Sequence, residues 1–210
     1  PVVSSAASDV YKRQELNLAD FFRLNGISYE ALPIETNDEG KENLFAGRCD
    51  VYTTDASGLS STRAAASNPD KWVVLPEIIS KEPLGPLVRH GDHQWGDVVR
   101  WSLNAMIIAE ELGVTSENVD AQMSSNVPEV LRLLGVEGNY GEMLELSNDW
   151  AYQIIKQIGN YSESYEANVG PDTPLEIARG LNALWTQGGI LYAPPSVSYT
   201  HLTLPTIPQV

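Results

Sequence analysis

Cysteine is almost absent from the sequence, since Cys49 is the one thiol among 210 residues. One cysteine excludes a disulfide within the chain and a paired-cysteine metal knuckle. Cys49 starts an apolar run typical of a strand, where burial favours an inert thiol over a nucleophile. Pairing with a cysteine from a missing upstream segment stays open as an alternative.

Basic side chains are also scarce, with 13 Lys and Arg against 28 Asp and Glu and a formal net charge of −15. This charge repels phosphate backbones and anionic lipid surfaces, so we expect no nucleic-acid partner. Long apolar runs are missing too: the run at 105–109 is typical and ends at Glu110 and Glu111. A membrane-spanning helix needs roughly 20 such residues, so we expect no membrane insertion. No signal peptide is visible at the start.

Motifs for common chemistry are lacking. There is no P-loop and no GxGxxG, and Ser57 lies in DASG rather than in a nucleophile elbow. His90 and His93 flank Asp92 in a turn, but zinc needs a third protein ligand, so solvated histidines are the simpler interpretation. We therefore expect no metal, no cofactor and no catalytic group, which favours binding over turnover.

Both ends of the chain differ from its middle. Residues 1–14 (PVVSSAASDVYKRQ) and 196–210 (SVSYTHLTLPTIPQV) are rich in Ser, Thr and Val without an amphipathic period. They resemble translated adaptor sequence, so we treat both as non-native tails and leave them out of the fold. Ordinary disordered tails are the alternative. If the ends are foreign, the chain is a fragment truncated at Glu15.

Residues 15–88 alternate between helical and strand patterns. Leu18, Phe21 and Phe22 share one face of a helix that Gly26 can end. The alternation implies parallel βαβ crossovers and hence an α/β fold. The expected helices are 15–26, 36–48 and 56–67, and the expected strands are 27–34, 49–54 and 71–79.

Residues 89–195 are helical in pattern. The last expected helix, 173–189, has clear punctuation: Thr173 and Glu176 have capping-box spacing, Pro174 takes the first position, and Gly188 ends it. The other expected helices are 94–113, 126–135 and 147–170. We expect all five tryptophans to be core, namely Trp72, Trp95, Trp101, Trp150 and Trp185.

Asp55 follows the expected strand 49–54 and is the most informative polar residue. In open α/β sheets, ligands bind beyond the carboxyl ends of the strands, where a carboxylate suits an ammonium group. Aspartate is also a favoured N-cap, and local sequence alone favours that role. The two roles are compatible, because one oxygen can cap the helix while the other binds.

Several segments resemble the periplasmic general L-amino-acid-binding component of ABC uptake systems. They include AGRCDVYTTDASGL, EIISKEPLGP, IKQIGNY and GLNALWTQGGI, and the similarity runs across essentially all of residues 15–195. The resemblance implies a periplasmic-binding-protein-like (type II) two-lobed fold, here incomplete. Residues 15–88 correspond to most of the second lobe, and 89–195 to the hinge return and the C-terminal helices that pack on the first lobe.

In that family, the strand ending in Asp delivers a carboxylate to the ligand's α-ammonium, which implies the same role for Asp55, with Thr54 a weaker neighbour. The family's Gly-Thr-Thr-type turn, which contacts the ligand carboxylate, is replaced here by YKRQ. Its arginine partner for that carboxylate would lie upstream. The resemblance thus implies that this chain holds half of the ligand clamp.

The expected function is substrate binding for a periplasmic ABC importer of L-amino acids, as a monomer working with an inner-membrane permease. The chain itself is expected to be a binding-deficient fragment rather than an enzyme. An alternative is a lyase on the same scaffold, similar to cyclohexadienyl dehydratase, for which Asp55, Glu77 and Glu82 are the available acids. A receptor sensor domain is a third possibility, but no membrane segment supports it.

Overall fold

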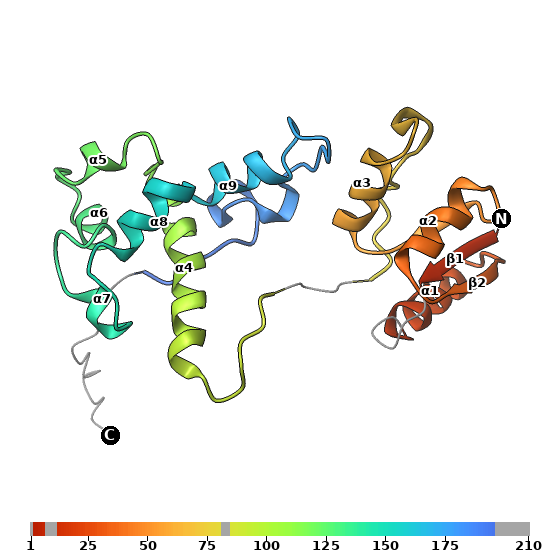
Figure 1. The fold of residues 1–210 in the computed structure, drawn as a ribbon, viewed down its shortest axis with the longest axis horizontal. Helices are drawn as coiled ribbons and strands as arrows, with labels where there is room; N and C mark the ends of the chain where they lie inside the picture. The colour runs from red at the N-terminus through yellow and green to blue at the C-terminus, as the bar shows by residue number, and fades with distance from the viewer. Residues whose placement is uncertain (1, 7–11, 81–84, 196–210) are drawn as a thin grey trace, which may run out of the picture. The chain divides into compact units, whose positions relative to one another are not determined.

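The computed structural model describes residues 2–6, 12–80 and 85–195, and the chain divides into two compact units (Figure 1). The first unit comprises the chain up to Gly85 together with Val169–Ala178. The second comprises Pro86–Asn168 and the chain from Arg179 onward. Segment 169–178 thus groups with the first unit although residues of the second precede and follow it.

The first unit is built on a parallel sheet. Strand β1 (Val2–Ala6) pairs with β2 (Glu30–Ile34) on one side and with β3 (Val51–Thr53) on the other, giving the order β2-β1-β3. The connecting helices are α1 (Lys12–Leu24) and α2 (Asn37–Phe45), and α3 (Ala56–Ala64) follows β3. These elements confirm the α/β class predicted from the alternating pattern.

Two sequence-based expectations fail in this unit. Residues 1–14 are expected to take no part in the fold, yet Val2–Ala6 forms the central strand and α1 begins at Lys12. The strand expected at 71–79 is also absent: a 3-10 turn covers Pro69–Lys71, and residues 72–80 form no strand among the described residues. Val73 and Ile78 are exposed there, whereas Ile79 packs against the cluster of Leu18 and Phe22, so the apolar run that suggested a strand is only partly covered by this unit.

Consecutive residues of β3 separate the two faces of the sheet, because side chains alternate along a strand. Val51 packs with Leu18 and Phe22 of α1. Tyr52 is buried on the opposite face with Ile34 of β2. Leu44 of α2 and Leu59 of α3 pack against that second pair, so α1 covers one face while α2 and α3 contribute to the other.

The second unit is helical. Its longest helix, α4 (His93–Glu111), confirms the expectation for 94–113, and its contacts are with α6, α8 and α9. The remaining helices are α5 (Val119–Gln122), α6 (Pro128–Leu133), α7 (Tyr140–Met143), α8 (Trp150–Ile158) and α9 (Tyr161–Asn168). In the described part of the chain, no helix combines the length and apolar character that crossing a bilayer requires.

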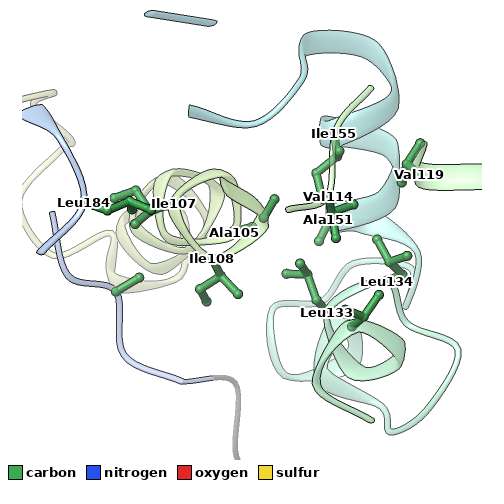
Figure 2. Packing of buried hydrophobic residues seen from close by; sticks show 13 residues of the cluster. Ala105, Ile107, Ile108, Val114, Val119, Leu133, Leu134, Ala151, Ile155 and Leu184 are labelled. Carbon is green, nitrogen blue, oxygen red and sulfur yellow. The ribbon is translucent and has the colours of Figure 1, made fainter. Parts of the chain in front are cut away.

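One apolar cluster holds these helices together (Figure 2). Ile107 and Ile108 of α4 and Ala151 and Ile155 of α8 are almost fully buried in it, as is Leu134 after α6. The expectation that all tryptophans are core is wrong in part, because Trp95 is 54% exposed and Trp185 51%.

The helix expected at 173–189 does not form. The structure has 3-10 turns at Gly180–Asn182 and Trp185–Gln187 instead. Thr173 Oγ1 donates to the Gly170 carbonyl and accepts from the Leu175 amide, so it makes no capping box. Glu176 has φ +53°, which a right-handed helix excludes.

Arg179 shows why tertiary contacts override the helical pattern here. Its Nη2 donates to both carboxylate oxygens of Glu110 at 3.1 Å, and it also donates to the Asn182 carbonyl at 2.8 Å. Its guanidinium lies 5.2 Å from the ring centroid of Tyr161 and 5.4 Å from that of Tyr165. Burial raises the pKa of the Tyr165 hydroxyl. The ion pair of Arg179 and Glu110 is shielded from solvent, since the two side chains are 15% and 9% exposed. Arg179 therefore holds segment 179–182 against α4 and α9.

We predict that Arg179→Ala destabilises the chain by about 3–5 kcal/mol, because it leaves the Glu110 carboxylate buried without its partner. Replacing both partners by methionine should cost much less, since no charge is then left buried. Urea unfolding followed by circular dichroism measures both variants.

The matched control is Arg100→Ala, which removes the ion pair between Arg100 and Asp97. The two side chains of that pair are 69% and 47% exposed. We expect its effect to stay below about 1 kcal/mol. Equal effects of Arg179→Ala and Arg100→Ala would contradict the structural role assigned to Arg179.

Candidate functional site

The strand order creates a topological switch point at one edge of the sheet. The chain leaves β1 through α1 to β2, then returns through α2 past β1 to β3. Helices that follow β1 and β3 therefore pack on opposite faces, as the α1 and α3 contacts show. In open α/β sheets the crevice at such a switch point, beyond the carboxyl ends of the strands, is where ligands bind. Asp55 lies two residues after β3 ends and so stands at this position.

Asp55 occupies the N-cap position of α3 without capping it. Its backbone carbonyl accepts from the Leu59 amide at 2.9 Å, but its side chain makes no cap hydrogen bond. The residue is half-buried. Among the side chains that the structure describes, none forms a hydrogen bond or ion pair with the Asp55 carboxylate. The cap that local sequence favours is therefore not made, and both oxygens are available.

The N-terminus of α2 provides the contrast. Thr36 Oγ1 accepts from the Glu39 amide at 3.2 Å, and Glu39 Oε2 accepts from the Glu35 amide at 2.9 Å. The two side chains thus satisfy the backbone amides of Glu39 and Glu35 at the start of α2, in an arrangement similar to a capping box. Both helices start at the same edge of the sheet, yet one N-cap side chain is used and the other is not.

Thr54 is half-buried beside Asp55. A Cβ on Gly58 would lie 3.2 Å from Thr54 Cγ2 and 3.8 Å from its Oγ1. Glycine at position 58 therefore lets the first turn of α3 approach Thr54 closely. The ligand roles of Thr54 and Asp55 stay predictions.

The other candidate residues do not assemble into a reactive site. Cys49 is buried at 4% exposure, and Asp92 caps α4 by accepting from the Trp95 amide at 3.1 Å. Within the described ranges, no three His, Cys, Asp or Glu side chains are placed to hold a metal ion. Glu77 is exposed, and Glu82 lies outside the described residues.

The far end of α3 carries an ion pair that sequence reasoning missed. Arg63 pairs with Glu176, which is 113 positions away in the chain and belongs to segment 169–178 of the same unit. A pocket of 220 Å³ lies beside the pair, bordered by Pro69 and Pro174. No local pattern could reveal this contact, because its partners are adjacent only in the folded chain.

A second polar cluster lies in the helical unit. Asp120 of α5 accepts from Lys156 Nζ at 2.7 Å and from the Tyr152 hydroxyl at 2.9 Å, both on α8. These hydrogen bonds, that from Lys156 first, hold the pKa of Asp120 below its ordinary value. The same contacts raise the pKa of Lys156 and of Tyr152. Asp120 is 60% exposed and its partners lie on α8, so the cluster links two helices at the surface.

Comparison with solved structures defines the class of the fold. An ABC transporter periplasmic binding protein from Brucella ovis with glutathione bound is similar at a TM-score of 0.86 and 47% identity. The match covers 92% of this chain and 60% of that one. This confirms the predicted fold: the chain has the fold of part of a periplasmic binding protein.

Curated relatives narrow the class. The chain is 54% identical over 182 residues to the glutamate/glutamine/aspartate/asparagine-binding protein BztA of Rhodobacter capsulatus, covering 86% of this chain and 54% of that protein. It is 55% identical over 183 residues to the general L-amino acid-binding periplasmic protein AapJ of Rhizobium johnstonii, with shares of 86% and 54%. The putative amino-acid ABC transporter-binding protein YhdW of Escherichia coli is 53% identical over 182 residues, with shares of 86% and 53%.

The chain is therefore homologous to the periplasmic binding proteins of amino-acid ABC transporters, as the resemblance of its motifs predicted. It spans about half the length of the curated relatives it matches. The relatives' names describe binding proteins rather than enzymes. No protein-family model matches the chain.

We predict that Thr36→Ala and Asp55→Ala affect their helices differently. Loss of the Thr36 cap should cost about 1 kcal/mol and speed hydrogen exchange of the Glu39 amide about fivefold. Loss of Asp55 removes only a favourable charge at the start of α3, so the effect on α3 amides should stay below about twofold. Native-state hydrogen exchange read residue by residue measures both. A fivefold change in α3 would show that Asp55 does cap.

We also predict a pH effect at Asp120. Because its folded pKa is depressed, the stabilisation is present above its unfolded pKa of about 3.9 and is lost as pH falls through the folded value. Asp120→Asn should therefore flatten the loss of stability below about pH 4. Lys156→Met should flatten it as well, since it removes the main cause. Urea midpoints across that pH range that match the unmodified chain would contradict this.

Proposed function

We propose that this chain is part of the substrate-binding component of an ABC importer for L-amino acids, acting in the periplasm with an inner-membrane permease. In this proposal Asp55 accepts the α-ammonium of the ligand, with Thr54 beside it. The observation that carries the proposal is the unused Asp55 carboxylate at the switch point of a parallel sheet.

The named ligands of the relatives support a site for the amino-acid backbone groups. One relative is named for glutamate, glutamine, aspartate and asparagine, another for L-amino acids in general, and the solved neighbour holds glutathione. These molecules differ in side chain, but each presents an α-ammonium and an α-carboxylate on one carbon. A protein that fixes those two groups in a roomy pocket accepts many ligands. A carboxylate with both oxygens available fits the ammonium half of that task.

The surroundings of Asp55 would strengthen an ion pair with an ammonium group beyond its strength in water. The residue is half-buried, so closing the first lobe of the parent protein over it would remove water from the ion pair. Two unit charges 4 Å apart attract by about 1 kcal/mol in water and about 4 kcal/mol at the effective dielectric of a protein surface. Closure of the parent protein would therefore strengthen the contact, as expected of a binding protein that moves about a hinge.

The proposal assigns only half of the clamp to this chain. It spans about 54% of the relatives' length, and the carboxylate-binding groups implied by the resemblance fall outside residues 15–195. We therefore propose that residues 1–210, taken alone as a monomer, bind amino acids weakly or not at all.

The test uses a chimera in which residues 15–195 follow the N-terminal half of AapJ. We predict that L-amino acids, but not sugars, raise its melting temperature, because a ligand stabilises the state that it binds. Asp55→Ala in the chimera should weaken binding of L-glutamate at least about 30-fold, since it leaves the ligand's ammonium without its partner. Calorimetric titration measures the affinity.

The matched control is Asp70→Ala, which removes an exposed carboxylate of the same unit. It should leave the affinity unchanged. A folded chimera that no amino acid stabilises would contradict the proposed function, whereas equal affinities of the Asp55 and Asp70 variants would contradict only the role of Asp55. Binding by residues 1–210 as tight as by the chimera would contradict the half-clamp proposal.

A further inference from the structure

A small pocket on the helical unit combines aromatic and acidic side chains. It has a volume of 190 Å³ and lies at the C-terminal end of α4. Its apolar wall includes Ile108, which Figure 2 shows on that helix. The polar and aromatic residues around it are Glu111, Glu129, Trp185 and Tyr192.

The aromatic pair is fixed in place and open to solvent. The rings of Trp185 and Tyr192 are in edge contact at 5.7 Å and 69°, and the two residues are 51% and 66% exposed. The indole Nε1–H of Trp185 donates to Glu111 Oε1 at 3.0 Å, which orients the ring relative to that carboxylate. An exposed, oriented indole face attracts cations through its quadrupole.

The two carboxylates of the pocket, Glu111 and Glu129, form no ion pair with a basic side chain among the described residues. The neighbouring Glu110, in contrast, is paired with Arg179. A pocket with an aromatic face and two unpaired carboxylates is complementary to an organic cation.

The size of the pocket limits the occupant. Small-molecule sites usually measure about 300–1,000 Å³, and 190 Å³ is below that range. The volume suits one side-chain head group rather than a complete ligand. The chain's net charge of −15 also favours association with basic protein surfaces over acidic ones.

We propose that this pocket receives the cationic head of an arginine or lysine side chain presented by a partner protein. Its guanidinium or ammonium group lies against the Trp185 ring and between the carboxylates of Glu111 and Glu129. The pocket lies within the helical unit, so this contact is separate from the ligand role proposed for Asp55.

The test follows the indole Nε1–H signal of Trp185 by NMR in residues 1–210, with Trp185→Phe to assign it. Ethylguanidinium is the probe, and ethylurea is its neutral counterpart. We expect a saturable shift with the first that weakens with added salt, and none with the second. Acetyl-Gly-Arg-Gly-amide should produce the same shift, since it presents the cation as a side chain.

Glu111→Gln keeps the acceptor for the indole but removes the charge, and Glu129→Gln removes the other charge. Each should weaken the probe's apparent affinity about two- to fivefold, while Glu117→Gln, an exposed carboxylate outside the pocket, should not. No saturable shift, an equal shift with ethylurea, or equal affinities in all three variants would overturn the proposal. Binding of ethylguanidinium without binding of the peptide would overturn it too, since the site would then take free cations only.

Discussion

The order of three parallel strands is the constraint on which the candidate site depends. Because the chain returns past β1 to form β3, helices α1 and α3 pack on opposite faces, and the sheet has a switch point between β1 and β3. Any polar residue just after β3 then stands where such sheets bind ligands. The strand order thus determines where residue 55 lies, whereas the sequence determines that this residue carries a carboxylate.

The helical unit depends on a different kind of contact. Its apolar cluster packs the helices, but Arg179 decides the path of the segment that follows α9. The Arg179 guanidinium contacts the Glu110 carboxylate and the rings of Tyr161 and Tyr165 at the same time. A regular helix through 173–189 would have to keep these contacts or provide another partner for the shielded cation. The buried pair is worth little as net stability, yet breaking it is costly, so it specifies one path.

Local patterns predicted what local physics controls. Leu18 and Phe22 on one face predicted helix α1, the helical apolar pattern of 94–113 predicted α4, and the position of Asp55 followed from the strand before it. Patterns failed where distant partners decide. The capping signals at Thr173 and Glu176 were overridden, because Glu176 pairs with Arg63 across the fold. Whether a strand pairs is also non-local, so residues 71–79 looked like a strand and Val2–Ala6 did not.

The two ends of α3 explain how an unused carboxylate can be held in place. At the start of α3, the Asp55 side chain does not form a cap hydrogen bond, which would contribute roughly 1 kcal/mol to stability. Thr36 does form such a bond at the start of α2, so selection for stability alone would favour one here too. At the end of α3, Arg63 is tied to Glu176, and Leu59 between them packs against the sheet. The helix is thereby anchored by contacts that do not involve Asp55. If Asp55 binds a ligand as proposed, a carboxylate on an anchored helix meets it with little further ordering, and the stability forgone at the cap is offset by pre-organisation for binding.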